Sequence, residues 1–265
     1  MVIELGLFLA LGMVVGLVAP AAGIGGGVLM VPAFLVIFPA FGIAPDMAAH
    51  MAVGSSVGAA ALMSLSAVHA HARNGAVDWR VFKALAPGLI VGAVIGGVIA
   101  HGLPDDILRR VFGALMLLLA IYLVWGRQPH EWRHSAGPSP RTALSAGFVI
   151  GEVGSMVGVG GGSMIVPFLL FQGLHSQRVA GTSSAGVLVA ALTAAITYIL
   201  VGRESPGLPA YSLGYLYGPA VTATAITAML LAPLGAKIAQ HLPRKRFQRL
   251  FAILLLIIAV RMLVF

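Results

Sequence analysis

Cysteine is absent from this chain, and charged side chains are scarce. The 265 residues include no cysteine, 9% charged residues and 59% hydrophobic residues, with a mean hydropathy of +1.00. Without cysteine there is no disulfide, no thiolate nucleophile and no cysteine ligand for a metal. Polar side chains are too few to cover the surface of a water-soluble domain of this size. We therefore expect an integral membrane protein.

The few charges are mostly positive, and the formal net charge is +8. A basic balance is also found in nucleic-acid-binding proteins. In so apolar a chain, basic loops facing the cytoplasm explain it better, so the expected partner is the lipid bilayer and not nucleic acid. The chain begins Met-Val-Ile-Glu, which is acidic where a secretory signal is basic, so we expect the first apolar run to stay as a membrane element.

Apolar stretches divide the chain into ten expected membrane elements, since about 20 residues of helix cross the ~30 Å hydrocarbon layer. They cover residues 2–19, 27–41, 47–70, 80–101, 106–125, 142–157, 162–173, 178–201, 211–240 and 246–265. Residues 126–141 form the only long polar break, so we expect a first membrane repeat (1–125), a cytoplasmic linker (126–141) and a second membrane repeat (142–265).

A glycine-rich stretch occurs once in each half. Residues 23–32 read GIGGGVLMVP, and residues 158–167 read GVGGGSMIVP. The pairs Ser55-Ser56 and Ser183-Ser184, and the two Leu-Pro turns at 103–104 and 242–243, extend the match. The pattern indicates a duplication.

The number of crossings in each half decides how the two repeats are oriented. An odd number inverts the second repeat and places most lysines and arginines on one side of the membrane, whereas an even number distributes them equally. We therefore expect an all-α fold of two inverted five-element repeats. It has 8 to 10 membrane elements, because each glycine segment can cross fully or form a re-entrant hairpin.

Three adjacent glycines would each cost a helix about 1 kcal/mol relative to alanine, so both segments are expected to interrupt a helix. Glycine N–H groups and the positive end of the following short helix can bind an anion without lysine or arginine. Close helix packing and hydrogen bonds between helices are the alternative roles. The candidate substrate-binding residues are Gly25, Gly26, Gly27, Ser55, Ser56, Gly160, Gly161, Gly162, Ser163, Thr182, Ser183 and Ser184.

Glu152 is the one ionisable residue clearly inside an expected span. It is a candidate for proton coupling, and the alternative is a carboxyl hydrogen-bonded near a helix end. His50 and His175 are expected at the membrane interface. His69 and His71 point to different helix faces, so no metal site is expected.

Two expected helices carry small residues at four-residue spacing. Residues 88, 92 and 96 are glycines at four-residue spacing, and residues 228, 232 and 236 are alanines; both sets predict helix-packing faces. No cysteine nucleophile, His-x-x-Glu-His cluster or Walker A motif occurs, so we expect no enzyme, no cofactor and no nucleotide-driven pump.

Several motifs together resemble one family. They are the doubled Gly-Ile/Val-Gly-Gly-Gly before Val-Pro, the Gly-Ser-Ser and Gly-Thr-Ser-Ser stretches, residues 75–79 (GAVDW), residues 213–215 (LGY) and both Leu-Pro turns. In this order they resemble the sulfite exporter TauE/SafE family over nearly the whole chain. The resemblance implies a multi-pass transporter of the prokaryotic plasma (inner) membrane, with the glycine and serine/threonine segments in contact with substrate. Glu152 matches no family motif.

The expected function is a secondary transporter that moves sulfite, sulfoacetate or related organosulfonates by alternating access around the two glycine breaks, with export as the direction that the resemblance implies. The coupling ion, proton or sodium, stays open. A homodimer is also open, because small residues allow packing within one chain or between two. The alternative function is a cation- or neutral-solute carrier that uses Glu152 as a ligand.

Overall fold

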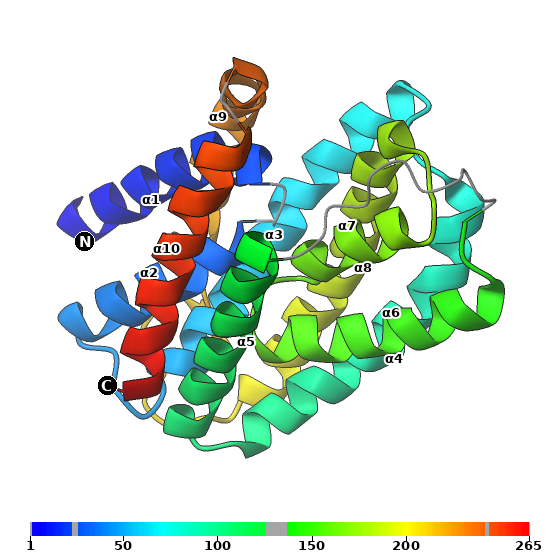
Figure 1. The fold of residues 1–265 in the computed structure, drawn as a ribbon. Helices are drawn as coiled ribbons and strands as arrows, with labels where there is room; N and C mark the ends of the chain where they lie inside the picture. Colours follow the sequence, from blue (N-terminus) through cyan, green and yellow to red (C-terminus); the bar gives the residue numbers. More distant parts are fainter. Residues whose placement is uncertain (1, 23–25, 126–136, 242–243, 265) are drawn as a thin grey trace.

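The computed structural model describes residues 2–22, 26–125, 137–241 and 244–264. These residues form ten helices and one small hairpin (Figure 1). The helices of the first half are α1 (Val2–Ala22), α2 (Gly27–Ala40), α3 (Ala48–Arg73), α4 (Trp79–Gly102) and α5 (Asp105–Trp125). Those of the second half are α6 (Pro140–Met156), α7 (Gly162–Phe171), α8 (Ser176–Gly202), α9 (Gly218–His241) and α10 (Arg244–Val264). Five of them are long and apolar enough to cross a membrane, so the expected all-α membrane fold is confirmed.

Helices α2 and α7 are too short to cross a bilayer. They contain 14 and 10 residues, which correspond to about 21 Å and about 15 Å at ~1.5 Å per residue. The hydrocarbon layer is ~30 Å thick, so each short helix reaches only part of the way through it. Each begins at its glycine segment, as the sequence predicts.

Residues 211–217 form a hairpin and not the beginning of a helix, so the prediction of one helix over 211–240 is wrong for this part. Strands β1 (Ser212–Leu213) and β2 (Leu216–Tyr217) pair antiparallel. Tyr211 (φ +66°) and Gly214 (φ +54°) have left-handed backbones, which interrupt helical geometry. Packing favours the hairpin, because the N–H of Tyr215 donates to the carbonyl of Tyr198 in α8. Burial, reinforced by the hydrogen bond with Glu4, raises the pKa of Tyr217 to about 12.

Small residues bring helices of the two halves into backbone contact. A Cβ at Gly88, Gly92 or Gly96 of α4 would overlap the backbone of α6, which confirms that these glycines form a packing face. Helix α1 meets α9 in the same way, since a Cβ at Gly16 would lie 2.6 Å from the carbonyl oxygen of Ala228. The contacts repeat between the halves: α4 packs on α6 as α9 packs on α1, and α2 packs on α3 as α7 packs on α8.

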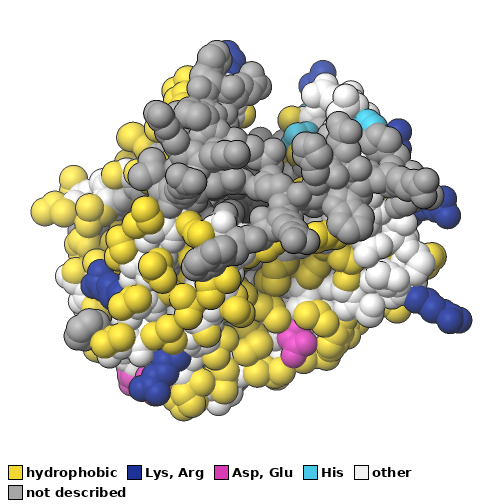
Figure 2. All heavy atoms as spheres, viewed as in Figure 1, with side chains coloured by type: hydrophobic (Ala, Val, Ile, Leu, Met, Phe, Trp, Pro, Cys, Tyr) yellow, Lys and Arg dark blue, Asp and Glu magenta, His cyan; other side chains and the backbone are white. Residues whose placement is uncertain are grey.

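The loops gather at the two ends of α3. Around its first turn lie the loop before it, the α4–α5 turn and the segment 203–217, whose Gly207 would place a Cβ 3.7 Å from Met47. Around its last turn lie residues 74–78 and the α7–α8 loop, joined by an ion pair of 3.3 Å between Arg178 and Asp78. We call these the Asp105 end and the Arg178 end. Hydrophobic side chains cover much of the face between them in Figure 2, as a lipid-facing surface requires.

Candidate functional site

The two glycine segments, far apart in the sequence, lie against one another. Gly27 is the first residue of α2, and a Cβ on it would be 2.5 Å from the carbonyl oxygen of Gly158 and 2.7 Å from the Cα of Val159. Both neighbours are backbone atoms that cannot turn aside, so only glycine fits at position 27. We call this contact, together with residues 26–28 and 158–163 on its two sides, the glycine junction. Gly25 lies outside the described residues.

The second segment has an unusual backbone. Gly158, Gly160 and Gly161 have φ values of +72°, +65° and +81°, a left-handed region that other residues enter at a cost of about 1–2 kcal/mol. The N–H groups of Val159 and Gly160 turn back to the carbonyl of Gly154, at 3.0 and 3.3 Å. Glycine N–H groups therefore do not all converge on one point. The first N–H groups of α7, beginning at Gly162, still have no acceptor within their own helix.

Three buried serines lie close to the second glycine segment in space or in the chain, although the hydroxyl of one of them, Ser155, faces α4, where a Cβ at Gly97 would lie 3.3 Å from its Oγ. Ser56 on α3 is buried and donates to the carbonyl of Gly158 at 2.7 Å, which ties α3 to the second segment. Ser163, in the first turn of α7, is 5% exposed, and Ser155, near the end of α6, is 2% exposed. Neither hydroxyl has a hydrogen-bond partner among the described residues. Such a group costs about 1–3 kcal/mol when buried, so both are suited to receive a ligand oxygen.

The sequence prediction included Ser163 and missed Ser155. Ser155 could have been identified from the sequence as a serine in the last turn of a helix that leads directly into the glycine segment. When the segments are aligned, the first half has Pro20 opposite Ser155 and Val28 opposite Ser163. Neither can donate a hydrogen bond from its side chain. Side-chain donors at these two positions therefore come from the second half alone.

Three of the other four predicted hydroxyls bind protein atoms in this structure. Ser55 accepts from the N–H of Tyr217 at 3.0 Å, and Thr182 accepts from the N–H of Asp78 at 2.9 Å. These two contacts are equivalent, so Ser55 corresponds to Thr182 and the sequence alignment of Ser55 with Ser183 was wrong by one residue. Ser184 donates to the carbonyl of Ala180, and Ser183 is buried in α8. Contact of these four residues with substrate stays a prediction.

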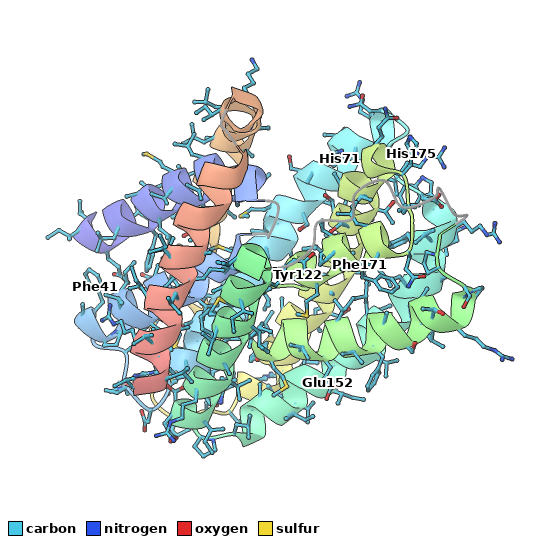
Figure 3. The ribbon with its side chains drawn as sticks, viewed as in Figure 1. Phe41, His71, Tyr122, Glu152, Phe171 and His175 are labelled. Atoms are coloured by element: carbon cyan, nitrogen blue, oxygen red, sulfur yellow. The ribbon has the colours of Figure 1, made fainter. Side chains whose placement is uncertain are left out.

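Glu152 lies on α6 beside α4 (Figure 3). Its backbone takes part in the close contact with Gly92 and Gly96, and its side chain is partly exposed. Its role in proton coupling stays a prediction. In the described part of the chain, no three His, Asp or Glu side chains are placed to hold a metal ion.

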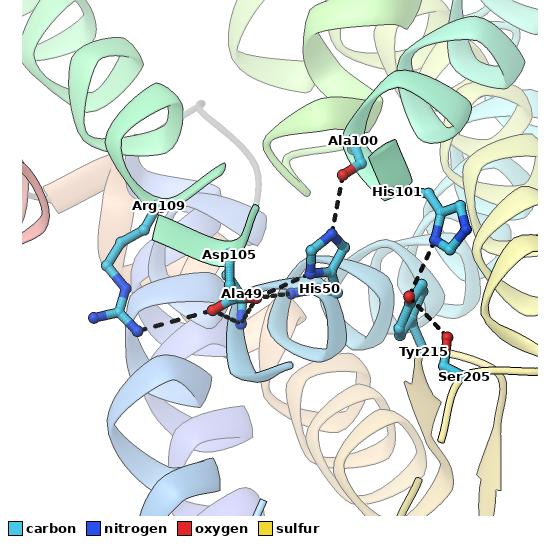
Figure 4. A network of polar contacts seen from close by, with 8 residues as sticks. All are labelled: Ala49, His50, Ala100, His101, Asp105, Arg109, Ser205 and Tyr215. Carbon is cyan, nitrogen blue, oxygen red and sulfur yellow. Dashed lines mark hydrogen bonds and ion pairs between the residues drawn. The ribbon is translucent and has the colours of Figure 1, made fainter. Parts of the chain in front are cut away.

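His50 is buried within the protein at the Asp105 end, whereas His175 is exposed; their place at the membrane interface stays a prediction. The His50 ring lies in the first turn of α3, with Nδ1 2.9 Å from Oδ1 of Asp105 and Nε2 3.0 Å from the carbonyl oxygen of Ala100 (Figure 4). Asp105 also accepts hydrogen bonds from the backbone N–H groups of Ala49 and His50. Sequence reasoning missed this site, because the pairing of residues 55 positions apart depends on the packing of three helix ends.

Comparison with known proteins agrees with this geometry. Residues 8–262 match the family model described as sulfite exporter TauE/SafE. A probable membrane transporter protein of Haemophilus influenzae is 28% identical over 256 residues, covering 97% of each chain. Probable membrane transporter proteins of Methanocaldococcus jannaschii and Bacillus subtilis are 25% and 22% identical, over 97% of this chain and 94% and 96% of theirs. No solved structure matches the chain.

Proposed function

Because this chain belongs to the sulfite exporter TauE/SafE family of membrane transporters, we propose that it is a secondary transporter of small anions such as sulfite, sulfoacetate or related organosulfonates. It acts in the prokaryotic plasma membrane, and export is the direction that the family description favours. The glycine junction is the substrate site, and one repeat rocks against the other around it.

The observation that carries this proposal is the meeting of two helix starts beside a buried hydroxyl without a partner. Helices α2 and α7 both begin at the junction, so the positive ends of two helix dipoles favour a negative charge there. The hydroxyl of Ser163, in the first turn of α7, adds a neutral donor at the same segment. Neutral donors suit an anion that must also leave again, because a buried lysine or arginine would hold it more strongly.

The loop positions support an inverted arrangement of the repeats. An odd number of crossings in each half brings residues 74–78 to the side of the α7–α8 loop, and an even number separates them. The Arg178–Asp78 ion pair joins these two segments. A Cβ at Gly137, next to the linker, would lie 3.2 Å from Val81 at the same end. Arg73, Arg80 and Lys83 also belong to this Arg178 end, which makes it the cytoplasmic side.

The described junction residues Gly27, Ser56, Gly158, Gly160 and Ser163 are all buried. A transporter that alternates its access passes through such a closed state between its two open ones. Access to the site then requires movement between the halves, and the α4–α6 and α1–α9 contacts are the surfaces over which it occurs.

Flux measurements in proteoliposomes test the function. The purified protein should move sulfite or a small organosulfonate and not sodium or an uncharged amide of similar size. Glu152→Gln separates the two carriers: an anion transporter keeps flux without a pH gradient, whereas a cation or neutral-solute carrier that uses Glu152 as a ligand loses it. Transport of cations in preference to anions would contradict the proposal.

A further inference from the structure

Asp105 and His50 form a buried pair at the Asp105 end, away from the glycine junction. Their exposed fractions are 8% and 6%. The pair joins three helix ends: the first turn of α3 through the N–H groups of Ala49 and His50, the last turn of α4 through Ala100, and the first turn of α5 through Asp105 itself (Figure 4).

The two hydrogen bonds of the His50 ring determine how many protons the pair holds. Both ring nitrogens of His50 face acceptors, a carboxylate oxygen at 2.9 Å and a carbonyl oxygen at 3.0 Å. A neutral imidazole donates from only one nitrogen. Both hydrogen bonds therefore exist only when the pair holds two protons, either as imidazolium with carboxylate or as neutral imidazole with a protonated carboxyl. In both forms the pair itself carries no net charge. Loss of one proton leaves a carboxylate that Arg109 and two backbone N–H groups face, and one ring nitrogen or carboxylate oxygen that faces another acceptor.

The groups around the pair are few. From α5, Nη2 of Arg109 lies 3.9 Å from Oδ2 of Asp105. From the hairpin, the ring of Tyr215 lies 5.1 Å from the His50 ring, and its hydroxyl is 3.0 Å from Nδ1 of His101 on α4. From α8, the ring of Tyr198 lies 6.3 Å from that of Tyr215.

The pair has a route to water. A cavity of about 490 Å³ lies at the same end, and Asp105 is among its lining residues. Its other lining residues are Pro45, Asp46, Pro104, Asp106 and Arg109. Because the buried carboxylate of Asp105 is part of this lining, it can exchange a proton with water in the cavity.

We propose that Asp105 and His50 together form the proton-binding site that couples proton movement to anion transport, an inference that rests on the proposed function. A proton from the cavity binds the deprotonated pair and gives carboxylate and imidazolium. The same proton leaves to water on the opposite side after the repeats have moved, and no other bond is made or broken. The loaded pair ties the start of α3 to the end of α4. Ser56 lies about 9 Å further along α3 at ~1.5 Å per residue, and its hydroxyl donates to the carbonyl of Gly158. When the pair loses its proton and its hydrogen bond to α4 breaks, the change therefore reaches the glycine junction through α3.

The second repeat lacks an equivalent. The turn Leu103-Pro104-Asp105 aligns with Leu242-Pro243-Arg244, and arginine does not release its proton in proteins. The chain therefore has one such site, on one side of the membrane.

Asp105→Asn gives a sharp test, because asparagine can keep the hydrogen bonds to the His50 ring and to Ala49 and loses only the one from the backbone N–H of His50. Its amide donates to Nδ1 of a neutral His50, Nε2–H donates to Ala100, and its oxygen accepts from Ala49. The variant thus resembles the loaded pair but has no exchangeable charge. Asp106→Asn is the matched control, since Asp106 lines the same cavity and is exposed.

The measurement uses proteoliposomes with the membrane potential clamped at zero and a one-unit pH gradient. With one proton per monovalent anion, the wild type and Asp106→Asn should hold about a tenfold concentration ratio of bisulfite or a monosulfonate at steady state, since a factor of ten is worth 1.4 kcal/mol. Asp105→Asn should hold a ratio near one and still exchange labelled anion at equal pH.

Three results would overturn the proposal: Asp105→Asn still holds the tenfold ratio, Asp106→Asn loses it equally, or folded Asp105→Asn loses exchange as well. If the wild type moves no anion, it is the transport function that fails. Proton binding is then read from infrared difference spectra between acidic and neutral pH. A carboxyl or imidazole band present in the wild type and absent from Asp105→Asn supports the site, and identical spectra would refute it.

Discussion

The two glycine segments have nearly the same sequence and use glycine for different reasons. In the first, Gly26 is right-handed (φ −71°), and Gly27 is required because the backbone of the second segment leaves no room for a Cβ. In the second, three glycines have left-handed backbones. Among the described residues, Gly27 of the first segment is therefore required by what it touches, and the glycines of the second segment by the path of their own chain. A repeated motif does not imply a repeated structure.

Gly27→Ala should give the largest effect, because it breaks the contact between the segments. The added Cβ would meet two backbone atoms at 2.5 and 2.7 Å, so the two segments have to move apart. A shift of about 1 Å at a functional site costs about 100-fold in rate. Anion flux in proteoliposomes measures it. Gly26→Ala is the control, since its Cβ would meet two side chains and no backbone atom: the flexible end of Met63 and Cγ1 of Val15, both at 2.8 Å. Equal flux of the two variants would show that the contact is not required.

Ser163→Ala tests whether the hydroxyl that distinguishes Ser163 from Val28, the aligned residue of the first repeat, binds the anion. A hydroxyl without a protein partner adds nothing to folding, so the free energy of unfolding should stay unchanged or rise. If the hydroxyl donates to the anion, binding should weaken about 10- to 100-fold. Titration calorimetry and thermal unfolding measure the two quantities on one sample. Exposed Ser145→Ala is the control, and a loss of stability without a loss of affinity would assign Ser163 to the fold.

Gly160→Ala should give the smallest effect. The nearest atom to the added Cβ would be 3.3 Å away, so the cost is backbone strain of about 1–2 kcal/mol in the left-handed region. Thermal unfolding should show this loss, and Gly160→Asn should recover part of it, because asparagine tolerates that conformation. If alanine and asparagine destabilise equally, steric contact and not backbone conformation explains the glycine.

Much of the fold could be predicted, because apolar runs and glycine breaks are local signals. The bounds of most helices, the two short helices and the packing face of α4 follow from them. The hairpin at 211–217 could not be predicted from local signals, since its residues are apolar and aromatic. Only the contacts with Ser55 and Tyr198 favour an extended chain there. The alignment of Ser55 with Ser183 failed for a related reason: the equivalence depends on which hydroxyl meets a backbone N–H of the other half.

The candidate site divides in the same way. The doubled motif located the glycine junction, and the hydroxyl of Ser163 could be read beside it. Ser155 and the Asp105–His50 pair could not, because a serine without a partner and a histidine between two acceptors are recognised only when the neighbours are known.

The sequence by itself determined that the chain is helical, enters a membrane and interrupts two helices with glycine, because composition and hydrophobic length act within one segment. Only the tertiary structure decided that the interruptions touch, which serines lack partners and where a buried histidine meets a carboxylate. Those properties depend on distances between segments far apart in the chain, which are set when all the helices pack at once.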